Sequence, residues 1–292
     1  MNKRCAPLAE APLRASLVEE AVKRALSEDL GLIGDLTSNA TIPIDARAKC
    51  QIAARHDGVI AGLDVARAAF YCIDREISFT AKRRDGASVA AGSLVATIAG
   101  NARAILAGER VALNFLGRLS GIATLTRSYV DKIAGTRAQI VDTRKTTPGL
   151  RAFEKYAVRC GGAMNHRAGL FDAILIKDNH IAIAGSLGKA ISAAKASGGH
   201  MVKIEVEVDR LDQLAQALEH DIDAVLLDNM SLNQLRDGVA LVDGRVLVEA
   251  SGGVSLDTVG AIARTGVDLI SVGALTHSAP VFDLGLDFMA AG

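Results

Sequence analysis

Residues 202–273 read VKIEVEVDRLDQLAQALEHDIDAVLLDNMSLNQLRDGVALVDGRVLVEASGGVSLDTVGAIARTGVDLISVG, and short apolar runs alternate with helix-length segments along this stretch. The four runs begin at Val202, Ala224, Val246 and Asp268, so each starts 22 residues after the one before. The segments between them, such as RLDQLAQALEH, have the apolar spacing of amphipathic helices. Strands that alternate with helices in this way are typical of βα units and predict a parallel sheet.

Two further apolar runs precede this stretch, AQIVDTRK at 138–145 and DAILIKDN at 172–179, which brings the predicted strands to six. A closed barrel and an open doubly wound sheet both satisfy the pattern. No G-x-G-x-x-G follows any run, which disfavours a dinucleotide-binding sheet. We therefore predict an α/β fold with a parallel α/β barrel over residues 116–276.

The first part of the chain predicts a separate α+β domain over residues 1–115. Residues 16–29, SLVEEAVKRALSED, carry one apolar stripe and predict a helix with Ser16 and Glu19 as a capping box. Residues 47–99 alternate short β-like runs with one helix-like stretch. A long segment rich in good helix formers follows and predicts a helix.

The composition is that of a globular protein with an aliphatic core, since 50% of the 292 residues are hydrophobic and only 3% are aromatic. Lys plus Arg and Asp plus Glu number 33 each, which argues against a nucleic-acid or membrane partner. No apolar run reaches transmembrane length, and the four cysteines contain no C-x-x-C pair. We expect a cytoplasmic protein.

Every predicted barrel strand turns polar or glycine-rich where it ends, and in a parallel barrel these ends meet at one mouth, where active sites lie. The mouth would hold the cations Arg144, Lys145, His166, Arg167 and Lys177 and the acids Glu205, Glu207 and Asp228. Because the cations outnumber the acids, we predict a substrate with carboxylates and phosphates. The alternative is a set of solvated charges on the barrel rim.

Two acidic residues of one predicted strand suit a metal ion. Glu205 and Glu207 are two residues apart, so both point to the same side, and together with Asp228 they could hold Mg²⁺ carrying a diphosphate. The alternative is a structural layer of ion pairs with Lys145 or Lys177.

A glycine loop suits a phosphate. Ser251, Gly252 and Gly253 precede a predicted helix, and glycine amides at such a place form an anion-binding nest. The loops after the last two strands of a barrel are the usual phosphate position, and Gly273 with Ala274 fits the same role.

The histidines are expected to differ in their roles. Only His166, beside Arg167 and ahead of a strand, is expected to contact a ligand, and His180 is expected to pack near the site or support it. The incidental surface or loop histidines are predicted to be His56, His200, His220 and His277. No H-E-x-x-H and no Cys/His cluster indicates zinc.

Several long blocks closely resemble the signature blocks of the quinolinate phosphoribosyltransferase family, which are type II phosphoribosyltransferases. The blocks are DTRKTTPGLR, EKYAVRCGGAMNHRAGLFDAILIKDNHI, IEVEVD, VLLDN, EASGGVSLDTV and GVDLISVGALTHS, together with EDLGLIGDLTS and AGERVALNFLGRLSGIAT nearer the N-terminus. They occur in the expected order over nearly the whole chain.

The resemblance implies an open α+β sandwich, then an incomplete barrel of about six strands, with residues 277–292 returning to the first domain. It implies transfer of phosphoribosyl from 5-phosphoribosyl 1-diphosphate to quinolinate with decarboxylation, giving nicotinate mononucleotide, CO₂ and diphosphate in de novo NAD biosynthesis. It further implies Mg²⁺ as cofactor, no organic cofactor, and a homodimer, which in some members assembles into hexamers.

The resemblance also assigns roles. Arg144, His166, Arg167 and Lys177 would bind the quinolinate carboxylates, and Arg110 would enter from the neighbouring subunit. The other implied substrate-binding residues are Thr143, Lys145, Glu207, Asp228, Ser251, Gly252, Gly253, Gly273 and Ala274. The implied catalytic residues are Lys145, Lys177, Glu207 and Asp228, of which Glu207 and Asp228 would hold the Mg²⁺ directly or through water or substrate.

Three alternatives stay open from the sequence. The first is a paralogue of the same fold, such as the molybdenum-transport-associated relative. The second is a Schiff-base aldolase that uses Lys145 or Lys177 as its nucleophile. The third is a protein that binds quinolinate without catalysis.

Overall fold

The computed structural model describes residues 11–289, and the described chain forms two compact units. The first unit consists of residues 11–127, 152–162 and 279–289, and the second of residues 128–151 and 163–278. Each unit is built on its own sheet, antiparallel in the first and parallel in the second. The predicted fold class is therefore confirmed.

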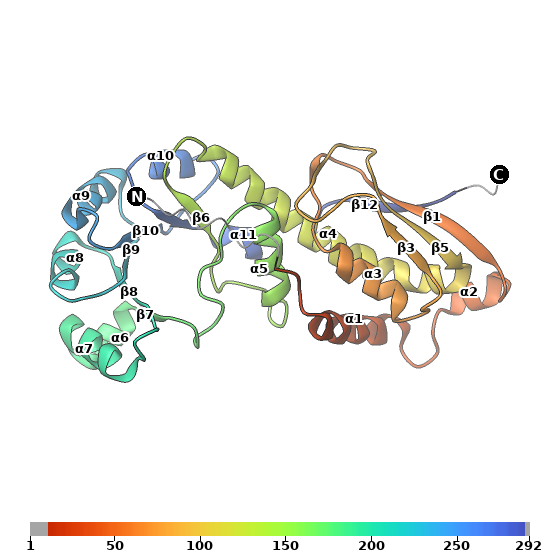
Figure 1. The fold of residues 1–292 in the computed structure, drawn as a ribbon, viewed down its shortest axis with the longest axis horizontal. Helices are drawn as coiled ribbons and strands as arrows, with labels where there is room; N and C mark the ends of the chain where they lie inside the picture. The colour runs from red at the N-terminus through yellow and green to blue at the C-terminus, as the bar shows by residue number, and fades with distance from the viewer. Residues whose placement is uncertain (1–10, 290–292) are drawn as a thin grey trace. The chain divides into compact units, whose positions relative to one another are not determined.

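The first unit contains a four-stranded sheet in the order β12-β1-β5-β3, with antiparallel neighbours. Its strands are β1 (Arg47–Ala54), β3 (Ser78–Ala81), β5 (Leu94–Asn101) and β12 (Leu284–Phe288), beside a ribbon of β2 (Gly58–Val59) and β4 (Ser88–Val89). Its helices are α1 (Ala15–Leu30), α2 (Leu36–Thr41), α3 (Leu63–Tyr71), most of α4 (Ala102–Lys132) and most of α5 (Arg151–Cys160). Since β12 pairs with β1, the last described strand returns to this sheet (Figure 1).

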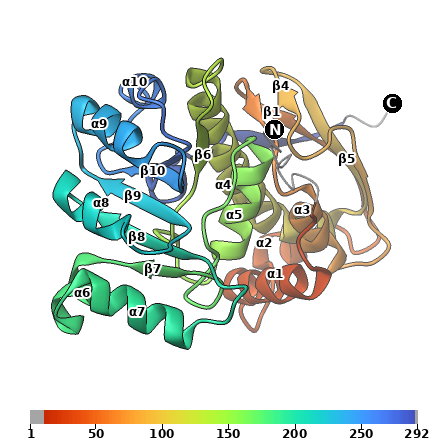
Figure 2. The ribbon, with the colours of Figure 1, turned by 60° about the vertical axis from the view of Figure 1, so that its left-hand side comes forward.

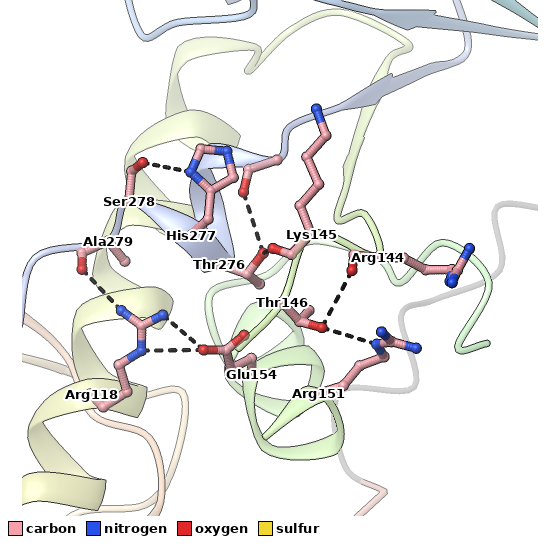
Figure 3. Close-up of polar contacts among 11 residues, drawn as sticks. Arg118, Arg144, Lys145, Thr146, Arg151, Glu154, Thr276, His277, Ser278 and Ala279 are labelled. Carbon is pink, nitrogen blue, oxygen red and sulfur yellow. Dashed lines mark hydrogen bonds and ion pairs between the residues drawn. The ribbon is translucent and has the colours of Figure 1, made fainter. Parts of the chain in front are cut away.

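The boundary between the units lies inside α4, after Arg127, rather than after residue 115 as the sequence predicts. The helix runs unbroken across both positions, so its sequence carries no signal of the change. Residues 152–162 also belong to the first unit. There Arg118 of α4 forms an ion pair of 2.7 Å with the fully buried Glu154 of α5 (Figure 3). Such a contact joins segments far apart in the sequence, which a local pattern does not reveal.

The start of α1 also differs from the prediction. The helix begins at Ala15 with Arg14 as its N-cap, and no side chain caps it. Ser16 lies within the helix, and Glu19 pairs with Lys23 one turn later at 2.6 Å. The predicted capping box is therefore wrong, because the helix begins two residues earlier than the box requires.

The second unit is a six-stranded parallel sheet in the order β6-β11-β10-β9-β8-β7, and its strands fall in the six predicted runs. The strands are β6 (Gln139–Val141), β7 (Ile174–Ile176), β8 (Ile204–Val208), β9 (Ala224–Asp228), β10 (Leu247–Ser251) and β11 (Leu269–Ser271). The helices are α6 (Asp178–Ala184), α7 (Leu187–Ser197), α8 (Leu211–Ala217), α9 (Leu232–Val242), α10 (Val259–Ala263) and α11 (Ala274–His277). Helices α7, α8 and α9 follow one another along the outer side of the sheet (Figures 1 and 2).

The barrel is incomplete. In the described part of the chain β6 and β7 are edge strands of the sheet and do not pair with each other. Next to β6, Met164 forms an isolated parallel bridge with Val141. The six-stranded open barrel that the resemblance implies is therefore the fold of this unit.

Strand β8 shows how the sequence divides the two faces of this sheet. Ile204, Val206 and Val208 are buried, whereas Glu205 and Glu207 between them are partly exposed. Because side chains alternate along a strand, the apolar residues share one face and both glutamates share the other. The glutamates therefore line the hollow side of the sheet.

Within residues 11–289, no helix combines the length and the apolar character that crossing a membrane requires. Cys50 and Cys160 are buried free thiols and Cys72 is a partly buried one, whereas Cys5 lies outside the described residues.

Candidate active site

A cavity of about 710 Å³ lies at the C-terminal edge of the parallel sheet, where the strand ends meet. It is lined by all the predicted site residues except Arg110, namely Thr143, Arg144, Lys145, His166, Arg167, Lys177, Glu207, Asp228, Ser251, Gly252, Gly253, Gly273 and Ala274. The strand register explains this convergence, since the last residues of neighbouring parallel strands pair, as Asp228 does with Ser251. Loops that follow different strands thus share one pocket.

Arg110 lies on α4 in the first unit, whereas the cavity is lined by residues of the second. Its side chain is 65% exposed, and its guanidinium is 4.0 Å from the Glu109 carboxylate, the outer limit of an ion pair. Neighbouring residues on a helix do not face each other, so Glu109 is a weak partner. The implied entry of Arg110 into a neighbouring subunit's site stays a prediction.

The guanidinium groups of Arg144 and Arg167 both line the cavity. Burial lowers the pKa of Arg167, and the nearby charge of Arg144 lowers it further. The Arg167 Nη1 donates to the carbonyl oxygen of Ala173 at 3.1 Å. The Nε atoms of Arg144 and Arg167 are buried and have no hydrogen-bond partner among the described residues. Buried donors of this kind are normally satisfied, so the pair is suited to an anion.

The loop after β6 is held by hydrogen bonds that leave the Lys145 ammonium out of the network. The Thr276 hydroxyl donates to the Lys145 carbonyl oxygen at 2.7 Å, and Arg151 Nε donates to the Thr146 hydroxyl at 2.9 Å. Figure 3 shows the Lys145 side chain extending away from these bonds. A Cβ atom at Gly273 would lie 3.1 Å from Lys145 Cδ, so the glycine leaves room for the lysine stem. The fixed backbone thus presents an exposed cation to the cavity.

The acidic side of the cavity is formed by neighbouring strands. Lys177, at the end of β7, is ion-paired with Glu207 of β8. Asp228, at the end of β9, accepts a hydrogen bond of 2.7 Å from the Asn229 amide. The predicted alternative of an ion-pair layer therefore holds for Glu207, which is paired with Lys177 while it lines the cavity. An ion pair open to the cavity can exchange its partners when a charged ligand binds.

Glu205 does not line this cavity, although it shares a face of β8 with Glu207. It lies deeper in the barrel, with its Oε2 2.9 Å from His166 Nε2. The predicted grouping of both glutamates with Asp228 is therefore wrong for Glu205. The strand rises about 3.3 Å per residue, so two residues of separation place the carboxylates at different depths.

The glycine loop after β10 has the conformation that only glycine adopts readily. Gly252 has φ +92° and Gly253 φ +59°, and a Cβ atom at Gly252 would lie 2.1 Å from Asn229 Oδ1. The helix predicted to follow directly begins only at Val259, after a turn. The expected helix N-terminus is therefore absent from this loop, and its backbone amides alone would contact an anion.

Several residues of the site were not assigned a role from the sequence. His277, predicted to be incidental, lines the cavity, because the single turn of α11 brings it back beside the Gly273 loop. Asp142 is fully buried and accepts bonds from His166 N–H at 2.8 Å and from the Asn165 amide at 2.7 Å, so it orients this segment. The spacing of four residues between Gly273 and His277 is the signal that could have revealed the histidine.

His180 has the supporting role that the sequence predicts. Its Nδ1 accepts a hydrogen bond of 2.9 Å from the backbone N–H of Lys177, at the start of α6. It does not line the cavity. The contact instead fixes the backbone that carries the Lys177 side chain.

Two models of known families match the chain. Residues 35–120 match the N-terminal domain and residues 122–287 the C-terminal domain of quinolinate phosphoribosyl transferase. The chain is 44% identical over 276 residues to the nicotinate-nucleotide pyrophosphorylase (carboxylating) of Mycobacterium leprae, which covers 92% of this chain and 96% of that relative. It is 43% identical over 260 residues to a probable enzyme of the same name from Bacillus subtilis, with 89% of each chain covered.

Solved structures agree with this assignment. NadC from Streptococcus pyogenes superposes with a TM-score of 0.92 at 41% identity, covering 96% of this chain and all of that one. The nicotinate-nucleotide pyrophosphorylase of Francisella tularensis superposes with a TM-score of 0.92 at 40% identity, covering 95% of this chain and 98% of that one. Because the similarity extends over both units and the cavity, the chain belongs to the quinolinate phosphoribosyltransferase family.

Proposed function

We propose that the protein transfers the phosphoribosyl group of 5-phosphoribosyl 1-diphosphate to quinolinate, and that CO₂ is lost to give nicotinate mononucleotide and diphosphate. The observation that carries the proposal is a pair of partly buried arginines, Arg144 and Arg167, whose buried Nε donors lack partners in the described chain. Quinolinate carries two adjacent carboxylates, which would satisfy two such cations. Membership of the family favours this reaction over the aldolase and the binding protein, and the names of the relatives favour it over the paralogue.

The opposite side of the cavity suits the phosphorylated sugar. The open amides of Gly252 and Gly253 and the Lys145 ammonium are donors for phosphate oxygens. Glu207 and Asp228 offer hard carboxylate oxygens at the same edge, a donor set that fits Mg²⁺. Bound there with the diphosphate, Mg²⁺ would offset the negative charge that grows on the leaving group.

The chain's own residues mainly position two anions against each other. Arg144 and Arg167 would hold the pyridine ring so that its nitrogen faces the anomeric carbon of the sugar. Lys145 and Lys177 would stabilise the departing diphosphate while the new bond between nitrogen and carbon forms. The bond between C2 and its carboxylate then breaks and CO₂ leaves. The electron pair stays on C2, where the adjacent positively charged ring nitrogen stabilises it, and a proton from solvent at C2 completes nicotinate mononucleotide. The ring itself is the electron sink, so we propose that no organic cofactor takes part.

A direct assay tests the proposal. The protein is incubated with quinolinate, 5-phosphoribosyl 1-diphosphate and Mg²⁺, and both nicotinate mononucleotide and CO₂ are measured. We expect equal amounts of the two products. Binding of quinolinate without either product would instead favour the non-catalytic alternative.

We expect Asp228→Asn to lower kcat/KM for 5-phosphoribosyl 1-diphosphate by about 100-fold, because the substitution removes one of the two charges proposed to hold Mg²⁺. Quinolinate binding, measured by calorimetry without the second substrate, should change little. Asp237→Asn is the matched control, since Asp237 is exposed on α9 and does not line the cavity. Loss of quinolinate binding in Asp228→Asn would contradict the proposed division of the cavity.

We expect Gly252→Ala to lower the free energy of unfolding by about 2–3 kcal/mol and to weaken binding of 5-phosphoribosyl 1-diphosphate. The new methyl group would meet the side chain and backbone of Asn229, and the residue would keep an unfavourable positive φ. Gly244→Ala is the control, because Gly244 also has a positive φ but has open space around it. The free energy of unfolding of Gly244→Ala, measured with a denaturant, should fall by about 1 kcal/mol. Its affinity for 5-phosphoribosyl 1-diphosphate, measured by calorimetry, should not change. An equal fall in the free energy of unfolding in both variants would show that the clash with Asn229 has no effect on stability.

We further propose that the protein is a homodimer and acts in the cytoplasm. Large apolar side chains are exposed in both units, among them Leu32 and Ile33 in the first and Leu170 and Phe171 in the second. Exposed apolar groups of this size favour burial against another chain, and a second copy is the simplest partner. Free thiols at the three described cysteines suit a reducing compartment.

A further inference from the structure

The hollow of the parallel sheet contains a second cavity, at the opposite edge from the substrate pocket. It has a volume of about 860 Å³ and is lined mainly by residues from the beginnings of the strands. His166, Glu205 and Glu249 all line it. His166 and Glu249 also line the substrate pocket, whereas Glu205 does not. These side chains therefore form a floor between the two cavities.

The three side chains present their donor atoms to one point. His166 Nε2 lies 2.9 Å from Glu205 Oε2 and 3.5 Å from Glu249 Oε2. One donor atom from each residue lies within 4.8 Å of both others. In a tetrahedral complex with bonds of about 2.0–2.2 Å, neighbouring ligand atoms are about 3.3–3.6 Å apart. The arrangement needs only small side-chain shifts to reach that geometry.

Glu249 is the independent sign that this cluster accepts a ligand. Its side chain is only 1% exposed, and neither carboxyl oxygen makes a hydrogen bond of normal geometry within the described chain, although the Ser271 hydroxyl and the Glu205 carboxyl lie near enough to affect its pKa. Burial raises the pKa of Glu249 to about 8, and the charge of Glu205 adds to the increase. Buried carboxylates in proteins are normally hydrogen-bonded, paired or bound to a metal. The contact with His166, at ion-pair distance, leaves both oxygens without a hydrogen bond.

We propose that His166, Glu205 and Glu249 form a binding site for a divalent transition-metal ion such as Zn²⁺, separate from the proposed Mg²⁺ site. One imidazole nitrogen and two carboxylates are a ligand set that suits Zn²⁺, whereas Mg²⁺ prefers oxygen ligands alone. The ion's two positive charges would balance the two carboxylates. The second cavity offers an entry path and room for a water molecule as the fourth ligand.

Neighbouring residues determine how tightly this site would bind an ion and how the ion would affect the substrate pocket. The charge of the partly buried Arg167 interacts with Glu205, so it opposes a cation and weakens the binding of a metal ion. The site is distinct from Glu207 and Asp228, which line the substrate pocket but not the second cavity. Because His166 borders both cavities, a bound ion would fix its ring at the floor of the substrate pocket. The site goes beyond the proposed reaction and can be tested without substrates.

Zinc binding to the metal-free protein tests the proposal. The full chain is freed of metal with a chelator and dialysed against Zn²⁺, and zinc per chain is measured by elemental analysis and by competition with a chromophoric chelator. We expect one Zn²⁺ per chain at this site. Glu249→Gln and Glu205→Gln should each weaken its binding by about 100-fold or more, because loss of a ligand should cost at least as much as loss of a residue that only supports one.

Two controls keep the result interpretable. Glu207→Gln should retain the zinc, since Glu207 belongs to the other cavity. Glu249→Gln should unfold at or above the wild-type temperature when no metal is present, because it replaces a buried carboxyl without hydrogen bonds by a neutral amide of the same shape. Loss of zinc in that variant is then not a loss of fold.

A crystallographic measurement locates the ion. Crystals soaked in Zn²⁺ should show one anomalous peak between the three side chains, and the peak should be absent in Glu249→Gln. Failure of the wild-type protein to bind zinc, unchanged affinity in Glu249→Gln, or a peak only at Glu207 and Asp228 would each overturn the proposal. The first of these outcomes would leave the three side chains as a metal-free cluster that shares protons.

Discussion

Quinolinate should be used with a kcat/KM at least about 10³-fold higher than that for nicotinate. Nicotinate lacks the carboxylate at position 2 of the ring, so one of the two guanidinium groups, Arg144 or Arg167, would lose its partner in the complex. Both are partly buried, and both have an Nε atom without a hydrogen bond in the described chain. Leaving a buried charge unpaired costs several kcal/mol, which corresponds to this ratio.

The measurement is the rate of nicotinate mononucleotide formation from each acid under the same conditions of 5-phosphoribosyl 1-diphosphate and Mg²⁺. Arg167→Leu provides the control, because removing one cation should lower quinolinate turnover strongly and nicotinate turnover little. The ratio of kcat/KM for quinolinate to kcat/KM for nicotinate should then become smaller than in the wild-type protein. Similar kcat/KM values in the wild-type protein would show that the cavity is not built for two carboxylates.

Arg110→Ala and Lys145→Ala proteins should each be nearly inactive, while mixed dimers of the two should recover about half of the wild-type activity per dimer. Lys145 lines the cavity of the second unit, and Arg110 is an exposed cation of the first unit with only a distant ion-pair contact. If Arg110 completes the quinolinate site of the neighbouring subunit, one site of the mixed dimer carries both wild-type residues and the other carries neither. Activity is measured on heterodimers purified through two different tags.

A chain with both substitutions provides the matched control. Paired with a wild-type chain, it should give an inactive dimer, because each site then lacks either Arg110 or Lys145. If Arg110 instead serves its own subunit's site, the two results are exchanged: the dimer of single variants is inactive and the dimer with a wild-type chain is half active. The two arrangements of the active site therefore predict opposite patterns.

The sequence predicted the catalytic unit well, because the signals for its strands are local. Apolar runs, the last four of them 22 residues apart, marked all six strands, and the polar residues that follow each run marked the edge at which they meet. The predicted site residues other than Arg110 all line the cavity, as this reasoning and the family blocks led us to expect. The capping box at Ser16 and the helix expected directly after Gly253 were wrong. Each of these depends on where an element begins or ends, which local patterns define less sharply than its existence.

The sequence by itself determined which residues could reach a common mouth, because parallel strands align their ends whatever the details of packing. The tertiary structure alone decided how those residues divide among partners. Glu205 and Glu207 are equivalent by periodicity, yet one contacts His166 deep in the barrel and the other pairs with Lys177 at the substrate pocket. Their depth along the strand and contacts with residues 30 or more positions away set that difference. Glu249 likewise looked like any polar strand end, and only its burial without a hydrogen bond singled it out, since burial and pairing are properties of the packed interior rather than of the neighbouring sequence.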